Sequence, residues 1–104
     1  MDTVIDNLDD NLDEAAALMT MLSQPVRLKV LCNLLGEEKS VQTLTEICEL
    51  SQPAMSHHLA KLRKADLVGT RRDGQTIYYR VASKEAEAVL SVLHEIYCAP
   101  RDGT

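Results

Sequence analysis

The sequence contains no tryptophan and no phenylalanine, and it has only three cysteines in 104 residues. Without large aromatic rings, a core has to be built from Leu, Val, Ile, Met and Ala, and in so short a chain that core is small. We therefore expect one domain that dimerises, because a second copy can cover further helix faces. An odd number of cysteines cannot complete a disulfide framework.

Long apolar runs are also missing. No stretch approaches the roughly 18 apolar residues that a membrane helix needs. The first ten residues, MDTVIDNLDD, are acidic and do not have the basic start of a secretory signal. We expect a cytoplasmic protein that makes no contact with membranes and whose thiols stay reduced.

Motifs of catalysis are missing too. The sequence has no C-x-x-C pair, no Gly-rich phosphate loop and no hydrolase motif beside its thiols. We therefore expect no enzymatic activity and no cofactor.

The charge of the chain is unevenly distributed, although its net value is −5. Residues 1–24 carry six acidic side chains and no Lys or Arg. Residues 57–80 carry six bases and two acids, which gives this segment a charge of +4. Those bases are Lys61, Arg63, Lys64, Arg71, Arg72 and Arg80. A basic segment in an acidic chain indicates a surface that binds a polyanion.

Apolar residues at helical spacing predict four helices in the first two thirds of the chain. The first covers residues 13–23, the second runs from Pro25 to about residue 35, and the third lies within 40–50. The third begins either with Ser40 as its N-cap or with a capping box of Thr43 and Glu46, and the sequence leaves both open. Ser51-Gln52-Pro53 is a tight break before the fourth helix, so the third and fourth helices form a helix-turn-helix.

The pattern then changes to alternation. Two extended runs flank Asp73-Gly74, a strong hairpin signal. Ser83 precedes a last helix over 84–98, whose apolar stripe comprises Val89, Leu90, Leu93, Ile96 and Tyr97. The order of four helices, a β-hairpin and a helix predicts a mainly α winged helix-turn-helix. We expect it to occupy residues 13–99, between a flexible acidic segment, 1–12, and a short tail, 100–104.

The basic segment coincides with the fourth helix and the hairpin, the parts of a winged helix that touch double-stranded DNA. On the helix, the predicted DNA-binding residues are Gln52, Ser56, His57 and Lys61. Glutamine and serine can bond base edges, and lysine can reach guanine or phosphate. Around the hairpin turn, the predicted phosphate-binding residues are Arg71, Arg72 and Gln75. His58 lies between apolar positions, which favours a role in holding the helix in place.

These segments resemble the ArsR/SmtB family of bacterial winged-helix repressors. The similarity extends over residues 13–98 and is carried by S-Q-P-x-x-S-x-H-L-x-x-L, from Ser51, and R-R-D-G-Q-x-I-Y-Y-R, from Arg71. The resemblance implies a homodimer joined by its terminal helices, which binds operator DNA and is released by an inducer.

Many members of this family sense metals, which require three or four converging ligands. The thiolate motif of arsenic- and cadmium-type sensors would lie at the start of the third helix, where Ser40 and Gln42 stand instead. The zinc-type motif, Asp-x-His, would open the last helix, which begins Ser83-Lys84-Glu85. The known metal motifs are therefore absent, and we predict no metal site.

The positions of two of the cysteines resemble those in another branch of this family. Cys32, late in the second helix, and Cys98, at the end of the last, match the places of the two cysteines in the persulfide-sensing SqrR/BigR-like repressors. That resemblance implies that organic persulfides join Cys32 and Cys98 through a polysulfide or disulfide bridge and derepress sulfide-response genes. Cys48 does not belong to the pattern and is interpreted as a core thiol. A metal-responsive repressor and a redox-insensitive DNA-binding regulator remain the alternatives.

Overall fold

The computed structural model describes the backbone of residues 2–97 and the side chains of residues 11–97. Cys98 and the predicted tail, 100–104, lie outside the described residues. The elements, in chain order, are α1 (Asp2–Leu22), α2 (Pro25–Asn33), β1 (Lys39–Ser40), α3 (Val41–Cys48), α4 (Gln52–Lys64), β2 (Val68–Asp73), β3 (Thr76–Val81) and α5 (Lys84–Tyr97). The predicted winged helix-turn-helix is confirmed, and the short strand β1 is an addition to it.

Helix α1 is longer than the sequence analysis predicted, because it begins at Asp2 and not near residue 13. In the sequence, Val4, Ile5, Leu8 and Leu12 continue the helical spacing of the later apolar residues. The acidic side chains interspersed with them obscured that pattern. The end of the predicted flexible segment therefore falls inside a helix.

Serine side chains cap three of the helices. Ser40 accepts a hydrogen bond from the Thr43 amide at 3.1 Å, which decides between the two predicted starts of α3 in favour of Ser40. Ser51 accepts from the Ala54 amide at 3.3 Å, and Ser83 accepts from the Ala86 amide at 3.0 Å. Each cap satisfies an amide that has no partner inside its helix.

The core is aliphatic, as the missing aromatics predicted. Its buried side chains come from every helix, from the turns after α2 and α4, and from the start of β2: Leu22, Val30, Leu31, Leu34, Leu44, Met55, Leu59, Leu62, Leu67, Val68, Ala86 and Leu90. The predicted inner face of α4 is confirmed, since Met55, Leu59 and Leu62 are at most 1% exposed. The stripe on α5 is only partly covered, because Ile96 and Tyr97 are 53% and 75% exposed.

The sheet is antiparallel, with the strand order β1-β3-β2. Strands β2 and β3 form the predicted hairpin, in which Arg71 lies opposite Tyr78 and Asp73 opposite Thr76. Strand β1 pairs with the far side of β3 and places Ser40 opposite Tyr78. Ser40 is thus both the last residue of β1 and the N-cap of α3, which joins the sheet directly to the helix-turn-helix.

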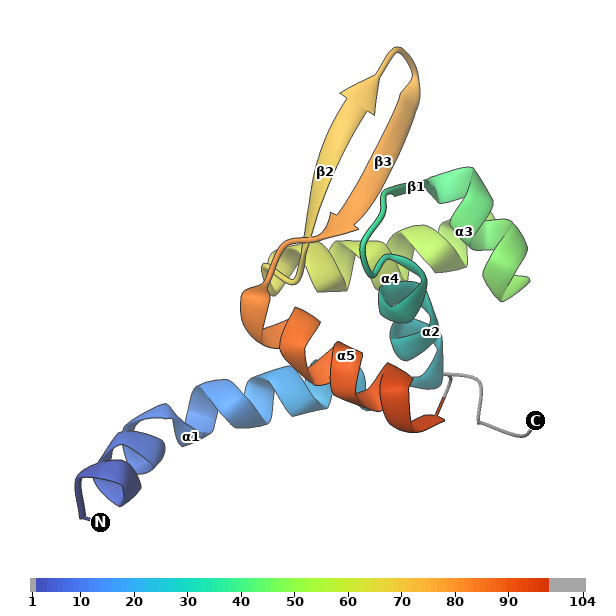
Figure 1. Cartoon of the computed structure of the whole chain (residues 1–104). Coiled ribbons are helices and arrows are strands. Elements are labelled where there is room, and N and C mark those ends of the chain that lie inside the picture. The colour runs from blue at the N-terminus through green and yellow to red at the C-terminus, as the bar shows by residue number, and fades with distance from the viewer. Residues whose placement is uncertain (1, 98–104) are drawn as a thin grey trace.

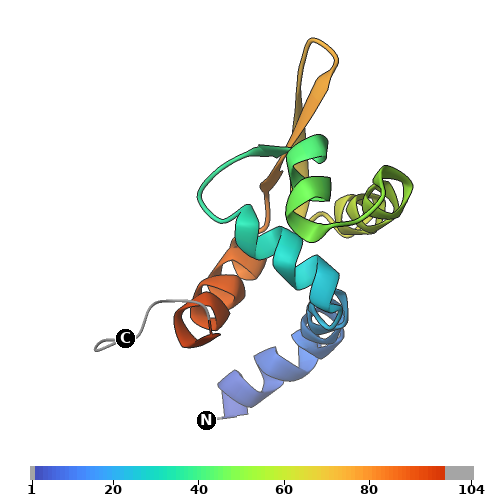
Figure 2. The same cartoon turned by 90° about the vertical axis from the view of Figure 1, so that its right-hand side faces the viewer.

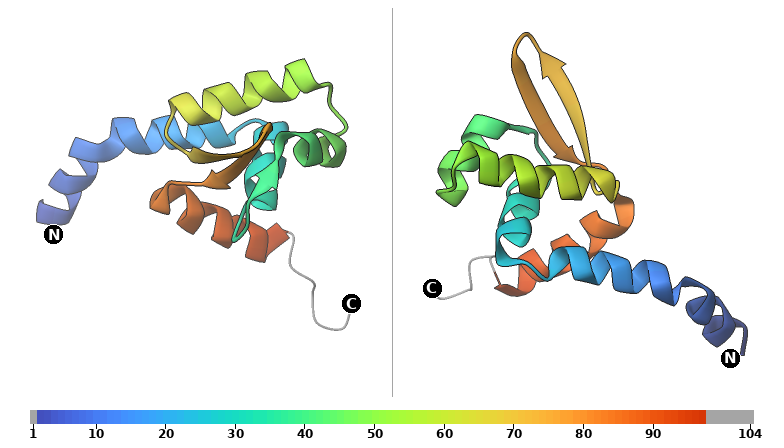
Figure 3. Two further views of the ribbon diagram at one scale, coloured as in Figure 1. Left: turned by 90° about the horizontal axis from the view of Figure 1, so that it is seen from above. Right: turned by 180° about the vertical axis from the view of Figure 1, so that it is seen from behind.

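The hairpin projects from the helical body, and α1 extends from the opposite end of the molecule (Figures 1 and 2). Helix α4 lies beneath the hairpin, and β2 rises from the C-terminal end of α4 (Figure 3). No helix in the part of the chain described is both long and apolar enough to cross a bilayer.

Candidate functional site

The outer face of α4 is polar and open to solvent. Its buried side is fixed by the three core residues described above, so the predicted DNA-binding residues must point away from the core. The structure leaves all four of them exposed: Gln52, Ser56, His57 and Lys61. Arg63 and Lys64 add positive charge in the last turn, where it also suits the helix dipole. These two bases belong to the basic segment of the sequence but are not among the predicted DNA-binding residues.

The hairpin turn presents a second polar surface. Gly74 adopts a positive φ of +64°, which the tight turn after Asp73 requires. Arg72 and Gln75 flank this turn and are exposed, as a phosphate contact would need. Their position at the far end of the hairpin separates them from α4, so the two surfaces can meet DNA at different points (Figure 1).

Arg71 differs from its neighbours because it is already bonded within the protein. Its Nε donates to both carboxylate oxygens of Glu38, at 3.0 and 3.2 Å, and its Nη2 donates to Oε1 at 2.9 Å. The guanidinium also lies over the ring of Tyr78, 4.6 Å from the ring centre. These hydrogen bonds lower the pKa of Glu38 and raise that of Arg71. Nothing in the sequence linked Glu38 to the hairpin.

His58 faces inward on α4, as expected for a residue that positions the helix. Its Nδ1 is buried and has no hydrogen-bond partner within the described residues. Burial is the main cause that lowers the pKa of His58, and the positive charges of Arg27, His57 and Lys61 act in the same direction. The imidazole is therefore held in its neutral form more strongly than a free histidine.

Cys32 lines a pocket of about 380 Å³ between α2 and α5. The other lining residues are Leu28, Lys29, Asn33, Leu93 and Tyr97. The thiol is half-buried and thus reachable from solvent. Tyr97 directly precedes Cys98 in the sequence, so the pocket lies where the described part of α5 ends.

Cys48 lies elsewhere, at the end of α3, and packs against the core. Burial raises the pKa of the Cys48 thiol, and the nearby charge of Lys29 offsets this only in part. A raised pKa reduces the thiolate fraction and with it the reactivity. This environment agrees with the interpretation of Cys48 as a core thiol.

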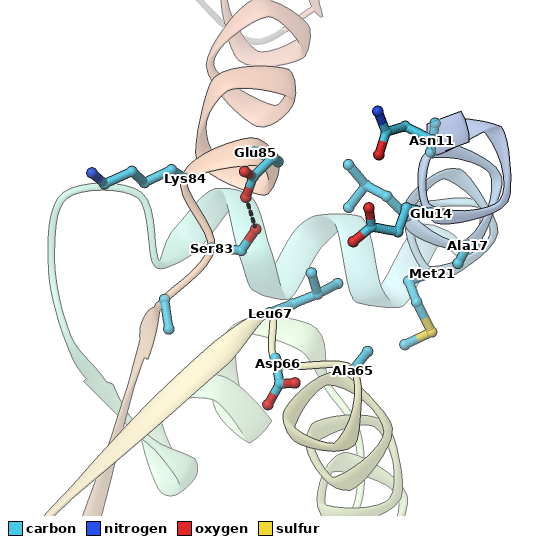
Figure 4. Close-up of a pocket in the computed structure, with 13 residues that line it drawn as sticks. Asn11, Glu14, Ala17, Met21, Ala65, Asp66, Leu67, Ser83, Lys84 and Glu85 are labelled. Atoms are coloured by element: carbon cyan, nitrogen blue, oxygen red, sulfur yellow. Dashed lines mark hydrogen bonds between the residues drawn. The ribbon is translucent and has the colours of Figure 1, made fainter. Parts of the chain in front are cut away.

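A larger groove of about 840 Å³ lies between α1, the start of α5 and the base of the hairpin (Figure 4). Leu18, Met21 and Leu67 line it, and Glu14 and Glu85 lie at its rim. Ser83 donates to the Glu85 carboxylate at 3.4 Å within the same groove (Figure 4). Among the side chains of residues 11–97, no three His, Cys, Asp or Glu converge closely enough to hold a metal ion.

A helix-turn-helix with an exposed polar second helix and a projecting basic hairpin defines a winged-helix protein of the DNA-binding class. Residues 24–70 match the model of the bacterial regulatory protein, arsR family. The chain belongs to this family, and it is accordingly a DNA-binding transcriptional regulator and not an enzyme.

Relatives of known structure share the whole fold. The chain is 40% identical to the transcriptional activator HlyU of Vibrio cholerae over 90% of its own length and 87% of HlyU. It superimposes on reduced HlyU from the same species with a TM-score of 0.86 and 41% identity, covering 89% of this chain and 98% of that one. It superimposes on the transcriptional repressor BigR from Xylella fastidiosa with a TM-score of 0.83 and 35% identity. That alignment covers 91% of this chain and 97% of BigR.

Proposed function

We propose that this chain is a transcriptional repressor that binds operator DNA as a homodimer and is released by reactive sulfur species. Its DNA contacts would be made by α4 in the major groove and by the hairpin turn on the backbone. The exposure of Gln52, Ser56, His57 and Lys61 on one face of α4 supports this assignment. Arg72 and Gln75 supply phosphate contacts at the turn. Of the relatives named above, BigR is a repressor and HlyU an activator.

The homodimer is supported by apolar side chains on the two terminal helices. Leu12 and Met19 of α1 are 47% and 57% exposed, and Val92 and Ile96 of α5 are 55% and 53% exposed. The large groove lies between the same two helices. A second copy packed against these faces would cover them and would set the distance between the two α4 helices.

The inducer response is proposed to use Cys32 and Cys98. The main observation in its favour is the pocket beside Cys32, which is lined on the α5 side by Leu93 and Tyr97, and Tyr97 is the last described residue before Cys98. A thiolate of either cysteine attacks the outer sulfur of an organic persulfide, RSSH, and releases the thiolate RS⁻. Two such persulfides in the protein then combine to a trisulfide and expel HS⁻, so that sulfur and electrons balance.

A bridge between these cysteines would tie α2 to α5. Helix α2 contributes Val30 and Leu31 to the core shared with α3 and α4, whereas α5 carries exposed apolar residues of the proposed dimer interface. Fixing one relative to the other would change the spacing of the two α4 helices. A coupling of roughly 1–3 kcal/mol is enough to weaken binding several-fold or more.

Operator-binding titrations at fixed salt test this function. Each of three reagents, glutathione persulfide, hydrogen peroxide or zinc, is added to four proteins: wild type, Cys32→Ser, Cys98→Ser and the control Cys48→Ser. We expect persulfide to release wild type and Cys48→Ser from DNA but to leave the other two bound, with an intramolecular polysulfide mass in the released proteins. Release of Cys32→Ser by persulfide would contradict the sensor, and release by zinc alone would favour the metal-responsive alternative. No response to any agent would indicate the redox-insensitive one.

A further inference from the structure

Arg71 and Glu38 are far apart in the sequence, but their contact links the two edges of the sheet. Arg71 lies on β2, opposite Tyr78 on β3, and Tyr78 lies opposite Ser40 on β1. Glu38 comes just before β1, so the guanidinium crosses the ring of Tyr78 to reach it. The contact therefore spans all three strands.

The Nε and Nη2 edge of the Arg71 guanidinium, one of the edges through which an arginine can bind a phosphate, is occupied by this contact. Arginine binds a carboxylate through two parallel N–H groups, and Nε and Nη2 of Arg71 serve Glu38 in this way, with distances from 2.9 to 3.2 Å. The stacking on Tyr78 fixes the plane of the guanidinium as well. Arg72, by contrast, is exposed near the turn.

We propose that Arg71 and Glu38 form a brace that holds the hairpin in position and that Arg71 is a positioning residue and not a phosphate contact. Glu38 precedes β1, which ends in Ser40, the N-cap of α3. The brace thus ties the hairpin to the first helix of the helix-turn-helix. It sets where Arg72 and Gln75 meet the DNA backbone when α4 is in its groove. This inference rests on the proposed DNA binding.

The geometry explains why an acidic residue is tolerated on a surface that faces a polyanion. A carboxylate near DNA would repel phosphates, but Arg71 neutralises Glu38, and Arg80 acts on the same carboxylate electrostatically. Glu37, the neighbouring acid, is instead paired with Lys39 at 2.9 Å, outside the brace. It therefore offers a matched control.

Charge-conserving variants separate the brace from a phosphate contact. Arg71→Lys loses the parallel donors, and Glu38→Asp shortens the acid, whereas both keep the charge of the surface. We expect each to weaken operator binding by about three- to tenfold, since each disturbs the bidentate ion pair that holds the hairpin. The double variant should be no weaker than either single one, because both break the same contact. Glu37→Asp should bind like wild type.

The salt dependence of binding gives the decisive readout. Neutralising one phosphate contact lowers the slope of log K against log[salt] by about 0.9. We expect Arg72→Ala to show that decrease. The charge-neutral double variant Arg71→Ala/Glu38→Ala, which leaves no carboxylate unpaired, should weaken binding with the wild-type slope. A reduced slope for this double variant, full binding by Arg71→Lys, or tighter binding by Glu38→Asp would overturn the brace and make Arg71 a phosphate contact.

Hydrogen exchange tests the brace without DNA. In Glu38→Asp, the amides that pair β1 with β3 should exchange several-fold faster than in wild type or Glu37→Asp, at an unchanged thermal midpoint. Unchanged exchange would overturn the brace. A wild type that binds no DNA would overturn the proposed function instead, so the two failures are distinguishable.

Discussion

Arg27, in the first turn of α2, donates from Nε to the carbonyl oxygen of Met21 at 2.7 Å. Its Nη2 reaches the carbonyl oxygen of Thr20 at 3.4 Å. Both carbonyls belong to the last turn of α1, where positive charge is favourable. The Thr20 carbonyl also accepts from the Ser23 amide and hydroxyl, so Arg27 matters most for the carbonyl of Met21. The last turn of α1 contains no base of its own, so the next helix supplies one.

We expect Arg27→Met to lower the free energy of unfolding by about 1–3 kcal/mol, because it removes the Nε donor from the part-buried carbonyl of Met21. The side chain is only 7% exposed, so water cannot readily replace it. Urea unfolding measures the effect. Lys29→Met, an exposed position on the same helix, is the control and should change stability little. Equal stability of both variants would contradict the role of Arg27.

The hairpin turn depends on the backbone of Gly74. An alanine Cβ would meet nothing within 4 Å there, so any cost comes from the positive φ of +64°. Gly74→Ala should therefore destabilise the protein by about 1 kcal/mol. Gly74→Asn should cost less, because asparagine tolerates this conformation better. Thermal unfolding measures the stability of the two variants. An Asn variant less stable than the Ala variant would refute this explanation.

His58 should make stability depend on pH. Its pKa in the folded state lies below the ordinary 6.5. As the pH falls through 6.5, the unfolded chain takes up a proton first, so stability is complete above that pH and is lost below it. We expect His58→Gln to lose less stability than wild type between neutral pH and pH 5.5. Ser56→Ala, which removes no titratable group from the same helix, should keep the wild-type dependence. Urea midpoints across the range measure both, and parallel curves for all three proteins would exclude His58 as the cause.

Binding experiments should distinguish the phosphate contacts of α4 from its contacts with base edges. Lys61→Ala should weaken binding similarly on all sequences and lower the salt slope by about 0.9, as expected for a phosphate contact. Gln52→Ala should instead relax the preference for one base pair and leave the slope unchanged. Titrations on operator and scrambled DNA at several salt concentrations test both. If Lys61→Ala changed only the sequence preference, Lys61 would read bases.

Local signals predicted most of the fold. The apolar spacing of Met55, Leu59 and Leu62, the serine caps and Asp73-Gly74 act over a few residues, and each is visible in the sequence. The long α1 was missed because acids interrupt its apolar spacing. Strand β1 was missed because two residues carry no alternation and their pairing with β3 is a contact between distant segments.

The candidate site was predictable in part. Exposure of Gln52, Ser56, His57 and Lys61 follows from helical geometry once the buried face is known. The ion pair of Arg71 could not be predicted, because its partner, Glu38, lies just before β1, 33 residues away in the sequence. The pairing of Cys32 with Cys98 stays a prediction, since Cys98 is outside the described residues.

Strand β1 also has a consequence for protein engineering. Because Ser40 ends a strand of the sheet and starts α3, the hairpin is not an independent module. A chimaera that places only residues 68–81 of this chain in a relative would carry Arg71 without Glu38, the acid that accepts its hydrogen bonds. Exchange of residues 37–40 together with the hairpin would preserve the junction.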